Sequence, residues 1–563
     1  MPDPFHLRID TVKGHHYARL VQSYREGGHS KKRTLLQIGA VTPIQIEVLK
    51  LWVAASPFLP SGKDTLLVDL GLVEKRRTWM YGREALAHHL WRELGLSRAL
   101  SDGLAGIPGR RGALRWIETM VVNRLVDPTS KYGLLDWLPT TATPFLVGYR
   151  PVHLYENLFY RAMDQLGRRQ RYWERIVFER VVRPATSRPE VLYHDLTSTY
   201  YEGQAGGLVQ YGHSRDRVEG APQVNFGMIV TPEGLPVTLQ VYPGNTKDDQ
   251  TVRPMRERLE KVFGLHGGIY VGDRGMRTKA NLKDLVQHGF HYVLAEKNST
   301  KIAQEALTLA QKVKAIPVSE KNTAREVVTS EGVRHVVLLN AERRQEELEI
   351  LALRQEEGKA ILAKWRKHAG KVHHHEILKG AQAELRKAGL QDLFDLGFDE
   401  DSFQGLTSEW KEKVHRTQEW AGWWVLATDT DLSVEEVARL YQGLSVIERG
   451  WREIKSVLKV RPLHHNLPRR IEAHLMICEL AYLVEKMLEL RVRKAGLKGT
   501  DGTPLTGAGA IERFLPVTVD EVGAKGSART RLVVTQLQPA QREVLEAAGI
   551  PLEAYSRGWG RLD

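Results

Sequence analysis

The sequence is short of cysteine: Cys478 is the single one among 563 residues. One thiol cannot form an intrachain disulfide, and it excludes a metal site built from several cysteines. The start of the chain, MPDPFHLRID, has no basic stretch followed by an apolar one, so no signal peptide is expected. We therefore expect a cytoplasmic protein.

Long apolar runs are missing too. No stretch approaches the roughly 18 consecutive apolar residues of a membrane-spanning helix, so we expect no membrane partner. Hydrophobic residues make up 42% of the chain and charged residues 26%, which is typical of a globular protein. A chain of 563 residues is too long for one compact core, so two to four domains are expected.

Acidic residues are too few to balance the basic ones. The chain has 81 Lys and Arg against 68 Asp and Glu, which leaves a net charge of +13. Such an excess favours a polyanionic partner, above all nucleic acid. A basic enzyme without such a partner is the alternative.

The basic excess begins at the N-terminus. The segments YARLVQSY and KKRTLLQIG alternate apolar and polar residues around the turn REGGHS, which predicts a basic β-hairpin. This hairpin could lie against DNA or be a solvated ribbon, and its composition fits both. We place it in an N-terminal region, residues 1–75. Residues 76–185 have apolar positions at helical spacing and could serve DNA binding or dimerisation.

The middle of the chain predicts an α/β sheet core. The strand-like VLYHDLTSTYY is followed by QVNFGMIV and LPVTLQVY, which TPEG joins as a hairpin. A helix, the strand GGIYVGD, a helix capped by Thr278 and the strand HYVLAEK complete residues 186–298. The charged segment 299–420 breaks this rhythm and is predicted to be an insertion. The sheet resumes in residues 421–495, and residues 496–563 form a C-terminal segment.

Three acids in this region point to metal chemistry. Asp195 and Asp273 lie at or near the ends of two predicted strands of one sheet. Glu448 lies in YQGLSVIERGWREIKSVLKVRP, residues 441–462, which we expect to be one continuous helix. One face of that helix would carry Tyr441, Leu444, Ser445, Glu448, Arg452, Lys455 and Lys459, and a second, packed on the sheet, would carry Ile447, Trp451, Ile454 and Leu458.

Two Asp and one Glu from two strands and a helix can hold a pair of divalent cations, Mg²⁺ or Mn²⁺. Any one of the acids taken alone would more often be a turn, cap or salt-bridge residue. The ordered set favours a two-metal site that acts on phosphodiesters.

The motifs around these acids carry a family resemblance. Tyr441, Glu448 and Lys455 fit the signature Y-x2-R-x3-E-x6-K, and the first two acids lie in DLTSTYYEG and VGDRGM. With YPGNTKDD, RPLHH and RIEAHLMICELAYL, the chain resembles the insertion-sequence transposases of the D-D-E class, in the branch with that signature.

The resemblance implies a ribonuclease-H-like catalytic core, a mixed sheet flanked by helices, with two-metal DNA cleavage and strand transfer. Asp195, Asp273 and Glu448 would be the catalytic metal ligands. The partners would be double-stranded DNA, both terminal inverted repeats and target DNA, and a second copy of the chain in a homodimer assembled on DNA.

The sequence departs from the signature at Leu444, where the branch has arginine. We expect Tyr441, Arg452 and Lys455 to hold DNA phosphates, with Arg449, Arg274 and Lys459 as further candidates. Two other functions are open to such a chain. An inactive DNA-binding regulator would be marked by a lost acid, and all three acids are present. A metal-dependent nuclease without strand transfer would use the same site.

Overall fold

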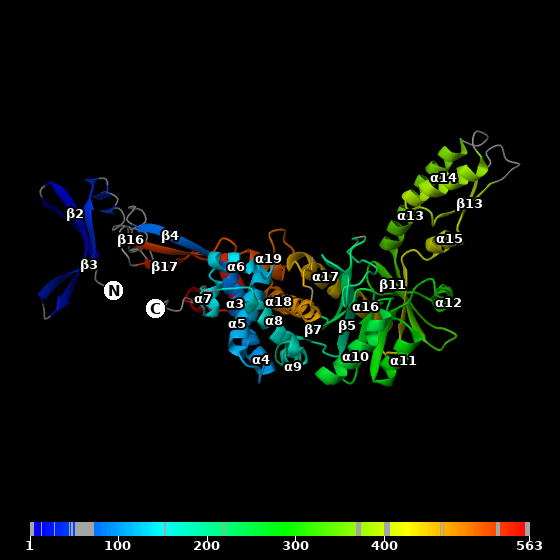
Figure 1. Cartoon of the computed structure of the whole chain (residues 1–563), viewed down its shortest axis with the longest axis horizontal. Helices are drawn as coiled ribbons and strands as arrows, with labels where there is room; N and C mark the ends of the chain where they lie inside the picture. Colours follow the sequence, from blue (N-terminus) through cyan, green and yellow to red (C-terminus); the bar gives the residue numbers. More distant parts are fainter. Residues whose placement is uncertain are drawn as a thin grey trace.

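The computed structural model describes residues 5–12, 14–26, 29–43, 45–46, 49–50, 73–150, 152, 154–216, 218, 220–367, 373–398, 406–461, 463–465, 467–524 and 530–557. The molecule is elongated, with a small N-terminal sheet at one end and a large sheet bearing a projecting arm at the other (Figure 1). A helical region lies between them.

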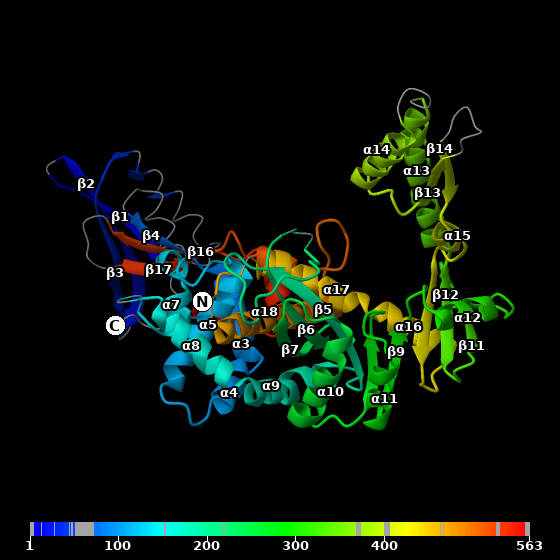
Figure 2. The ribbon, with the colours of Figure 1, turned by 45° about the vertical axis from the view of Figure 1, so that its right-hand side comes forward.

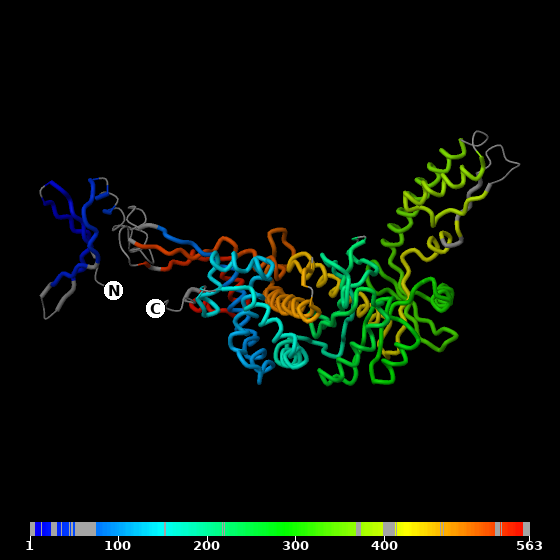
Figure 3. Tube along the Cα trace, in the orientation of Figure 1, coloured from blue at the N-terminus to red at the C-terminus, as the bar shows by residue number. Residues whose placement is uncertain are grey.

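The N-terminal sheet has three antiparallel strands, β1 (Phe5–Val12), β2 (His15–Glu26) and β3 (His29–Val41). The predicted hairpin is thus confirmed in its two strands, while residues 27–28 of its turn lie outside the described residues. Ala18, Leu20, Val41 and Leu49 form a small core of their own. The N-terminal sheet is therefore packed separately from the main body, as the trace in Figure 3 shows.

The helical region begins at Gly82 rather than at residue 76. Before it, β4 (Val73–Met80) pairs with β16 (Thr518–Ala524), which also pairs with β17 (Thr530–Val534). The C-terminal segment thereby completes a sheet begun near the N-terminus. The helices of the region are α3 (Gly82–Glu93), α4 (Leu96–Gly103), α5 (Arg110–Val126), α6 (Leu134–Trp137), η2 (Leu138–Thr140), α7 (Thr143–Val147), α8 (Asn157–Arg168), α9 (Gln170–Val177), η3 (Phe178–Val182) and η4 (Arg183–Ala185).

The long helix α18 (Pro468–Lys494) joins the helical region to the sheet. It contacts α5, α8 and the strand β7 (Pro236–Pro243), and it is buried along most of its length. The remaining C-terminal helices are α19 (Gly507–Glu512), α20 (Pro539–Ala547) and α21 (Leu552–Arg557), and α19 and α20 pack on α18.

The central sheet has the ribonuclease-H-like arrangement. Its strands β5 (Val191–Tyr200), β6 (Gln223–Val230), β8 (Gly268–Gly272) and β9 (Phe290–Ala295) lie with β7 in the order β7-β6-β5-β8-β9. The first two pairings in chain order, β5 to β6 and β6 to β7, are antiparallel, whereas β5, β8 and β9 run parallel. Crossover helices α10 (Asp249–Phe263) and α11 (Lys279–Gln287) connect the parallel strands, because parallel neighbours need such a connection.

The local signals of the sequence are confirmed here. The turn TPEG closes between Thr231 and Gly234, where Gly234 has a φ of +85°. The Thr278 hydroxyl accepts the Asn281 N–H as the cap of α11.

The first part of the predicted insertion extends the central sheet. The strands β10 (Ile316–Pro317), β11 (Asn322–Val328) and β12 (Arg334–Asn340) extend the central sheet, because β12 pairs with β15 (Trp423–Thr428) and β15 pairs with β9. The helix α12 (Lys301–Ala310) packs on these added strands.

The arm that projects from the sheet begins at residue 341 (Figure 2). It has its own hydrophobic core, which includes Leu351, Leu362 and Ile377. Its elements are α13 (Ala341–Arg366), α14 (His374–Lys387), β13 (Phe394–Phe398), β14 (Leu406–Trp410) and α15 (Glu412–Glu419).

The segment that carries Glu448 is not one continuous helix. It starts with α16 (Val434–Gly443), which Ser433 and Glu436 cap reciprocally, and continues as α17 (Ser445–Arg452) and the π-helical turn η5 (Glu453–Val457). Leu444 separates the first two. Among the described residues, no helix combines the length and apolarity needed to cross a membrane.

Candidate active site

The sheet brings the two aspartates together. Strands β5 and β8 are parallel, and His194 pairs with Gly272 at the end of their shared register. Asp195 and Asp273 are the next residues on the two strands. Because the carboxyl ends of adjacent parallel strands meet at one edge, the two carboxylates lie close enough for the charge of Asp273 to act on Asp195.

The carboxylate of Asp195 is held from two sides. Its Oδ1 accepts the Leu196 N–H at 2.8 Å, and its Oδ2 accepts the Trp451 indole N–H at 2.9 Å. Burial, with a smaller contribution from Asp273, raises the pKa of Asp195 to about 7. Within the described part of the chain no basic side chain forms an ion pair with Asp195. A negative charge here therefore favours a bound cation.

Helix α17 places Glu448 opposite the strands. Ile447 and Trp451 are buried on the side of α17 that contacts β5, and the Trp451 ring packs edge-on against Phe226 of β6 at 5.2 Å. The predicted apolar stripe is confirmed, since Ile454 and Leu458 are buried too. Glu448 points the other way and is exposed.

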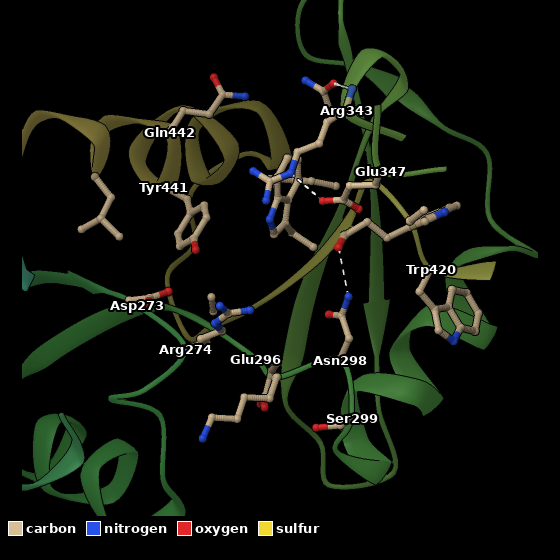
Figure 4. A pocket seen from close by; sticks show the side chains of 18 of the residues that line it. Asp273, Arg274, Glu296, Asn298, Ser299, Arg343, Glu347, Trp420, Tyr441 and Gln442 are labelled. Atoms are coloured by element: carbon tan, nitrogen blue, oxygen red, sulfur yellow. Dashed lines mark hydrogen bonds and ion pairs between the residues drawn. The ribbon is translucent and has the colours of Figure 1, made fainter. Parts of the chain in front are cut away.

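A cleft of about 1090 Å³ opens beside these acids (Figure 4). Asp273 and Arg274 form one side, and Tyr441 and Glu448 form another. Asp195 is not among the lining residues, because the Trp451 indole lies against it. The base of the arm and the added strands supply the remaining wall, with Glu296, Asn298, Arg343, Glu347, Trp420 and Trp424.

Tyr441 and Arg274 are two hydrogen-bond donors that line this cleft together with Asp273 and Glu448. Burial raises the pKa of the Tyr441 phenol, and the charges of Asp273 and Glu448 act in the same direction, so the hydroxyl stays protonated. Arg274 is exposed, and among the described residues it forms no ion pair. Both side chains can donate hydrogen bonds to a phosphate placed beside the acids.

Lys455 is held by an acid from a distant part of the sequence. Its ammonium donates to Asp216 Oδ1 at 2.8 Å, and Arg461 donates to the same oxygen at 2.8 Å. The side chain of Asp216 is only 2% exposed. Asp216 and Arg461 carry no signal in the sequence, because no local pattern links the loop before β6 to the residues after η5.

The other predicted DNA contacts are outside the cleft. Arg449, Arg452 and Lys459 are exposed but do not line it, and Lys459 has a left-handed φ of +44°. Arg452 still lies on α17 with Glu448, and the α-helical geometry ends only at η5. A π-helical turn has a wider hydrogen-bonding step than an α-helix, so η5 shifts the side chains after residue 452 around the axis.

The residues present suit a hard divalent cation in part. Asp195 and Asp273 offer adjacent carboxylate oxygens, the ligands that Mg²⁺ and Mn²⁺ prefer, although the charge of Arg215 also acts on Asp195. In the described ranges no three Asp, Glu, His or Cys side chains are gathered closely enough to be a complete metal site. Glu448 faces the same cleft as Asp273.

Comparison with known proteins gives a family. The model described as transposase DDE domain matches residues 187–484, and the model described as IS1634 family transposase, N-terminal domain, matches residues 7–57. A cryo-EM structure of the piggyBac transposase synaptic complex with hairpin DNA is similar at 9% identity and a TM-score of 0.35, covering 72% of this chain and 69% of that chain. No curated protein matches significantly. Since the DDE-domain match spans more than half of the chain and contains all three acids, this chain belongs to the insertion-sequence transposases of the DDE family.

Proposed function

We propose that this transposase binds the terminal inverted repeats of its element, cleaves the DNA there and joins the resulting 3′-OH ends to target DNA. The observation that carries the proposal is the register of β5 and β8, which sets Asp195 and Asp273 side by side at one sheet edge. Glu448 and Tyr441 face the same cleft from α17 and α16.

Each residue has a defined task in this proposal. Asp195, Asp273 and Glu448 would hold two Mg²⁺ or Mn²⁺ ions, which when bound activate the attacking oxygen and stabilise the leaving one. The Trp451 indole holds the Asp195 carboxylate in place through its 2.9 Å hydrogen bond. The protonated Tyr441 and the Arg274 guanidinium would orient the phosphate by donating hydrogen bonds to its oxygens.

Both DNA strands of an end must be positioned for such a reaction. Double-stranded DNA is the partner that the net charge of +13 favours, and we propose a homodimer assembled on it, with one copy at each end of the element. A nuclease without strand transfer is the alternative that uses the same site. It would yield cut ends but no joined products.

The first prediction tests the three acids. Asp195→Asn, Asp273→Asn and Glu448→Gln should each abolish Mg²⁺-dependent cleavage of an inverted-repeat duplex, because an amide is a poor ligand for a hard cation. DNA binding should stay largely intact, since the acids hold metal rather than DNA. Cleavage is measured on gels and binding by band shift.

Asp102→Asn is the matched control, since Asp102 is an exposed acid on α4 that pairs with Arg180. It should cleave as the parent does. A variant at Asp195, Asp273 or Glu448 that kept near-parental cleavage would remove that residue from the site. Joined products from the parent would decide against the nuclease.

A further inference from the structure

Basic side chains are buried behind the end of the segment that carries Glu448. Arg124 on α5 is 5% exposed, and Lys131, in the loop after α5, is 3% exposed. His474 on α18 is 5% exposed. These three side chains come from two different regions of the sequence and meet at the junction of the helical region and the ribonuclease-H-like core.

No carboxylate of the described residues neutralises this group. The charges that act on Lys131 come from Arg124 and from the Cys478 thiol, and those that act on His474 come from Arg124, Lys131 and His465. Burial and this mutual repulsion lower the pKa of Lys131 and of His474. Buried basic groups without a counter-charge cost free energy, which an anion bound beside them would offset.

Several nitrogens in the group have no hydrogen-bond partner among the described residues. These atoms are His474 Nδ1, Arg124 Nε and the Nε of Arg470, although the last lies 3.7 Å from Asp164 Oδ1 in an ion pair. The rest of Arg124 is occupied, since it donates to the carbonyl oxygens of Leu458 and Lys459 at 3.2 Å and of Thr129 at 2.8 Å. These nitrogen atoms are therefore available to bind a ligand.

A path of aromatic and basic side chains leads from this interior to the surface. The ring of His465 lies 5.3 Å from that of His474 and 6.0 Å from that of Tyr160 on α8. The Arg470 guanidinium lies over the Tyr160 ring at 4.5 Å. His464, at the outer end, has a side chain that is 58% exposed. An anion at the surface can therefore reach the half-buried His465 and Arg470. There it is attracted by the basic groups buried behind them.

We propose that this cluster is a binding site for a phosphate of the DNA backbone. Its members are Arg124, Lys131, His465, Arg470 and His474. The proposal rests on the proposed function, because its ligand is the phosphodiester of bound DNA. Among the described residues, Arg470 forms an ion pair with Asp164 at 3.7 Å, whereas no acid pairs with the other four members. Four basic groups without an acid, with Arg470 beside them, suit a phosphate, which several donors can contact at once. The adjacent exposed Lys459, whose carbonyl Arg124 holds, extends the site toward α17.

The test measures affinity of the full chain for a duplex of arbitrary sequence at salt concentrations from about 50 to about 200 mM. Lys131→Met and Arg470→Gln should each weaken binding roughly tenfold, and each should lower the slope of log affinity against log salt by about 0.9, the value for one lost phosphate contact. The matched control is Arg183→Gln, an exposed arginine of the helical region that pairs with Glu179. It should leave both quantities unchanged.

Arg470→Gln keeps the test decisive even if Lys131→Met does not fold. Lys131 is buried, and if Lys131→Met fails to fold by circular dichroism, Arg470→Gln decides alone, because its side chain is 27% exposed. Folded variants with the parental slope and affinity would overturn the site. A second result would also overturn the site: inorganic phosphate raises the melting temperature of the parent only, while both variants keep the parental DNA affinity. The ligand would then be a free anion.

Failure of this site and failure of the proposed function give different results. A parent that binds and cleaves DNA, with variants that do the same at the same salt slope, removes the phosphate site alone. A parent that does not bind DNA at all removes both.

Discussion

Arg274 follows Asp273 directly and lines the cleft together with Tyr441. From the sequence we expect Arg452 to hold a DNA phosphate, with Arg274 as a further candidate. In the structure Arg452 is exposed outside the cleft, whereas the charge of Arg274 acts on Tyr441. The side chain of Leu444 is 6% exposed and lines the cleft, so it packs between α16 and α17 without offering a hydrogen bond.

The second prediction follows from this placement. Arg274→Ala should lose about 1.5 to 3 kcal/mol of transition-state stabilisation, the range for a hydrogen bond to a charged group. Arg452→Ala is the matched control and should lose little. The measurement is the cleavage rate of both variants on one pre-cut end. If Arg274→Ala stayed active while Arg452→Ala were impaired, Arg452 rather than Arg274 would contact the phosphate.

At the level of elements, α18 is a long helix with acids buried along it. Glu485 is buried, and its burial, with the charges of Glu453 and Glu489, raises its pKa to about 8. The ordinary value in an unfolded chain is 4.5. The folded state therefore binds a proton that the unfolded state releases, so stability is lost as pH rises from the unfolded value toward about 8.

The third prediction is that Glu485→Gln removes this pH dependence. The free energy of unfolding of the parent should fall relative to the variant by a few kcal/mol between about pH 5 and about pH 9, at roughly 1.4 kcal/mol for each unit of pKa difference. Denaturant titrations at both pH values measure it. The control is Glu356→Gln, an exposed acid on α13. Parallel pH profiles for parent and Glu485→Gln would show that Glu485 is ionised in the folded state.

Across the whole molecule, the net charge of +13 determines how DNA binding responds to salt. If roughly six to ten phosphates are contacted, affinity should fall by about 10³ to 10⁵ between 50 and 200 mM salt, because each contact releases counterions. This fourth prediction is measured by fluorescence anisotropy with a labelled duplex. A flat response would mean that the basic surface does not contact the DNA backbone.

The fifth prediction concerns the N-terminal sheet. Its small core around Ala18, Leu20 and Val41 is separate from the main core, so its removal exposes little of the body. Deleting residues 1–50 should reduce binding to the inverted repeat while the remaining chain stays folded. The readout is the ratio of affinities for inverted-repeat and scrambled duplexes, with circular dichroism as the check on folding. An unchanged ratio would place end recognition in the helical region or in the arm.

The sequence by itself determined the parts of the molecule that depend on neighbouring residues. Strand-like runs predicted β5, β6 and β7, and the cap at Thr278 marked where α11 begins. The stripe from Ile447 to Leu458 predicted the buried side of the Glu448 segment. These signals survive because local backbone geometry and side-chain periodicity fix them.

Only the tertiary structure decided what lies beside what. Strands β10 to β12 look like part of an insertion along the chain, yet they join the central sheet because β15, some ninety residues later, supplies the pairing edge. The hydrogen bond from Trp451 to Asp195, the capture of Lys455 by Asp216 and the meeting of Arg124 with His474 each join distant segments. Such contacts depend on how preformed elements pack and on where one π-helical turn rotates the chain, and no local pattern encodes either.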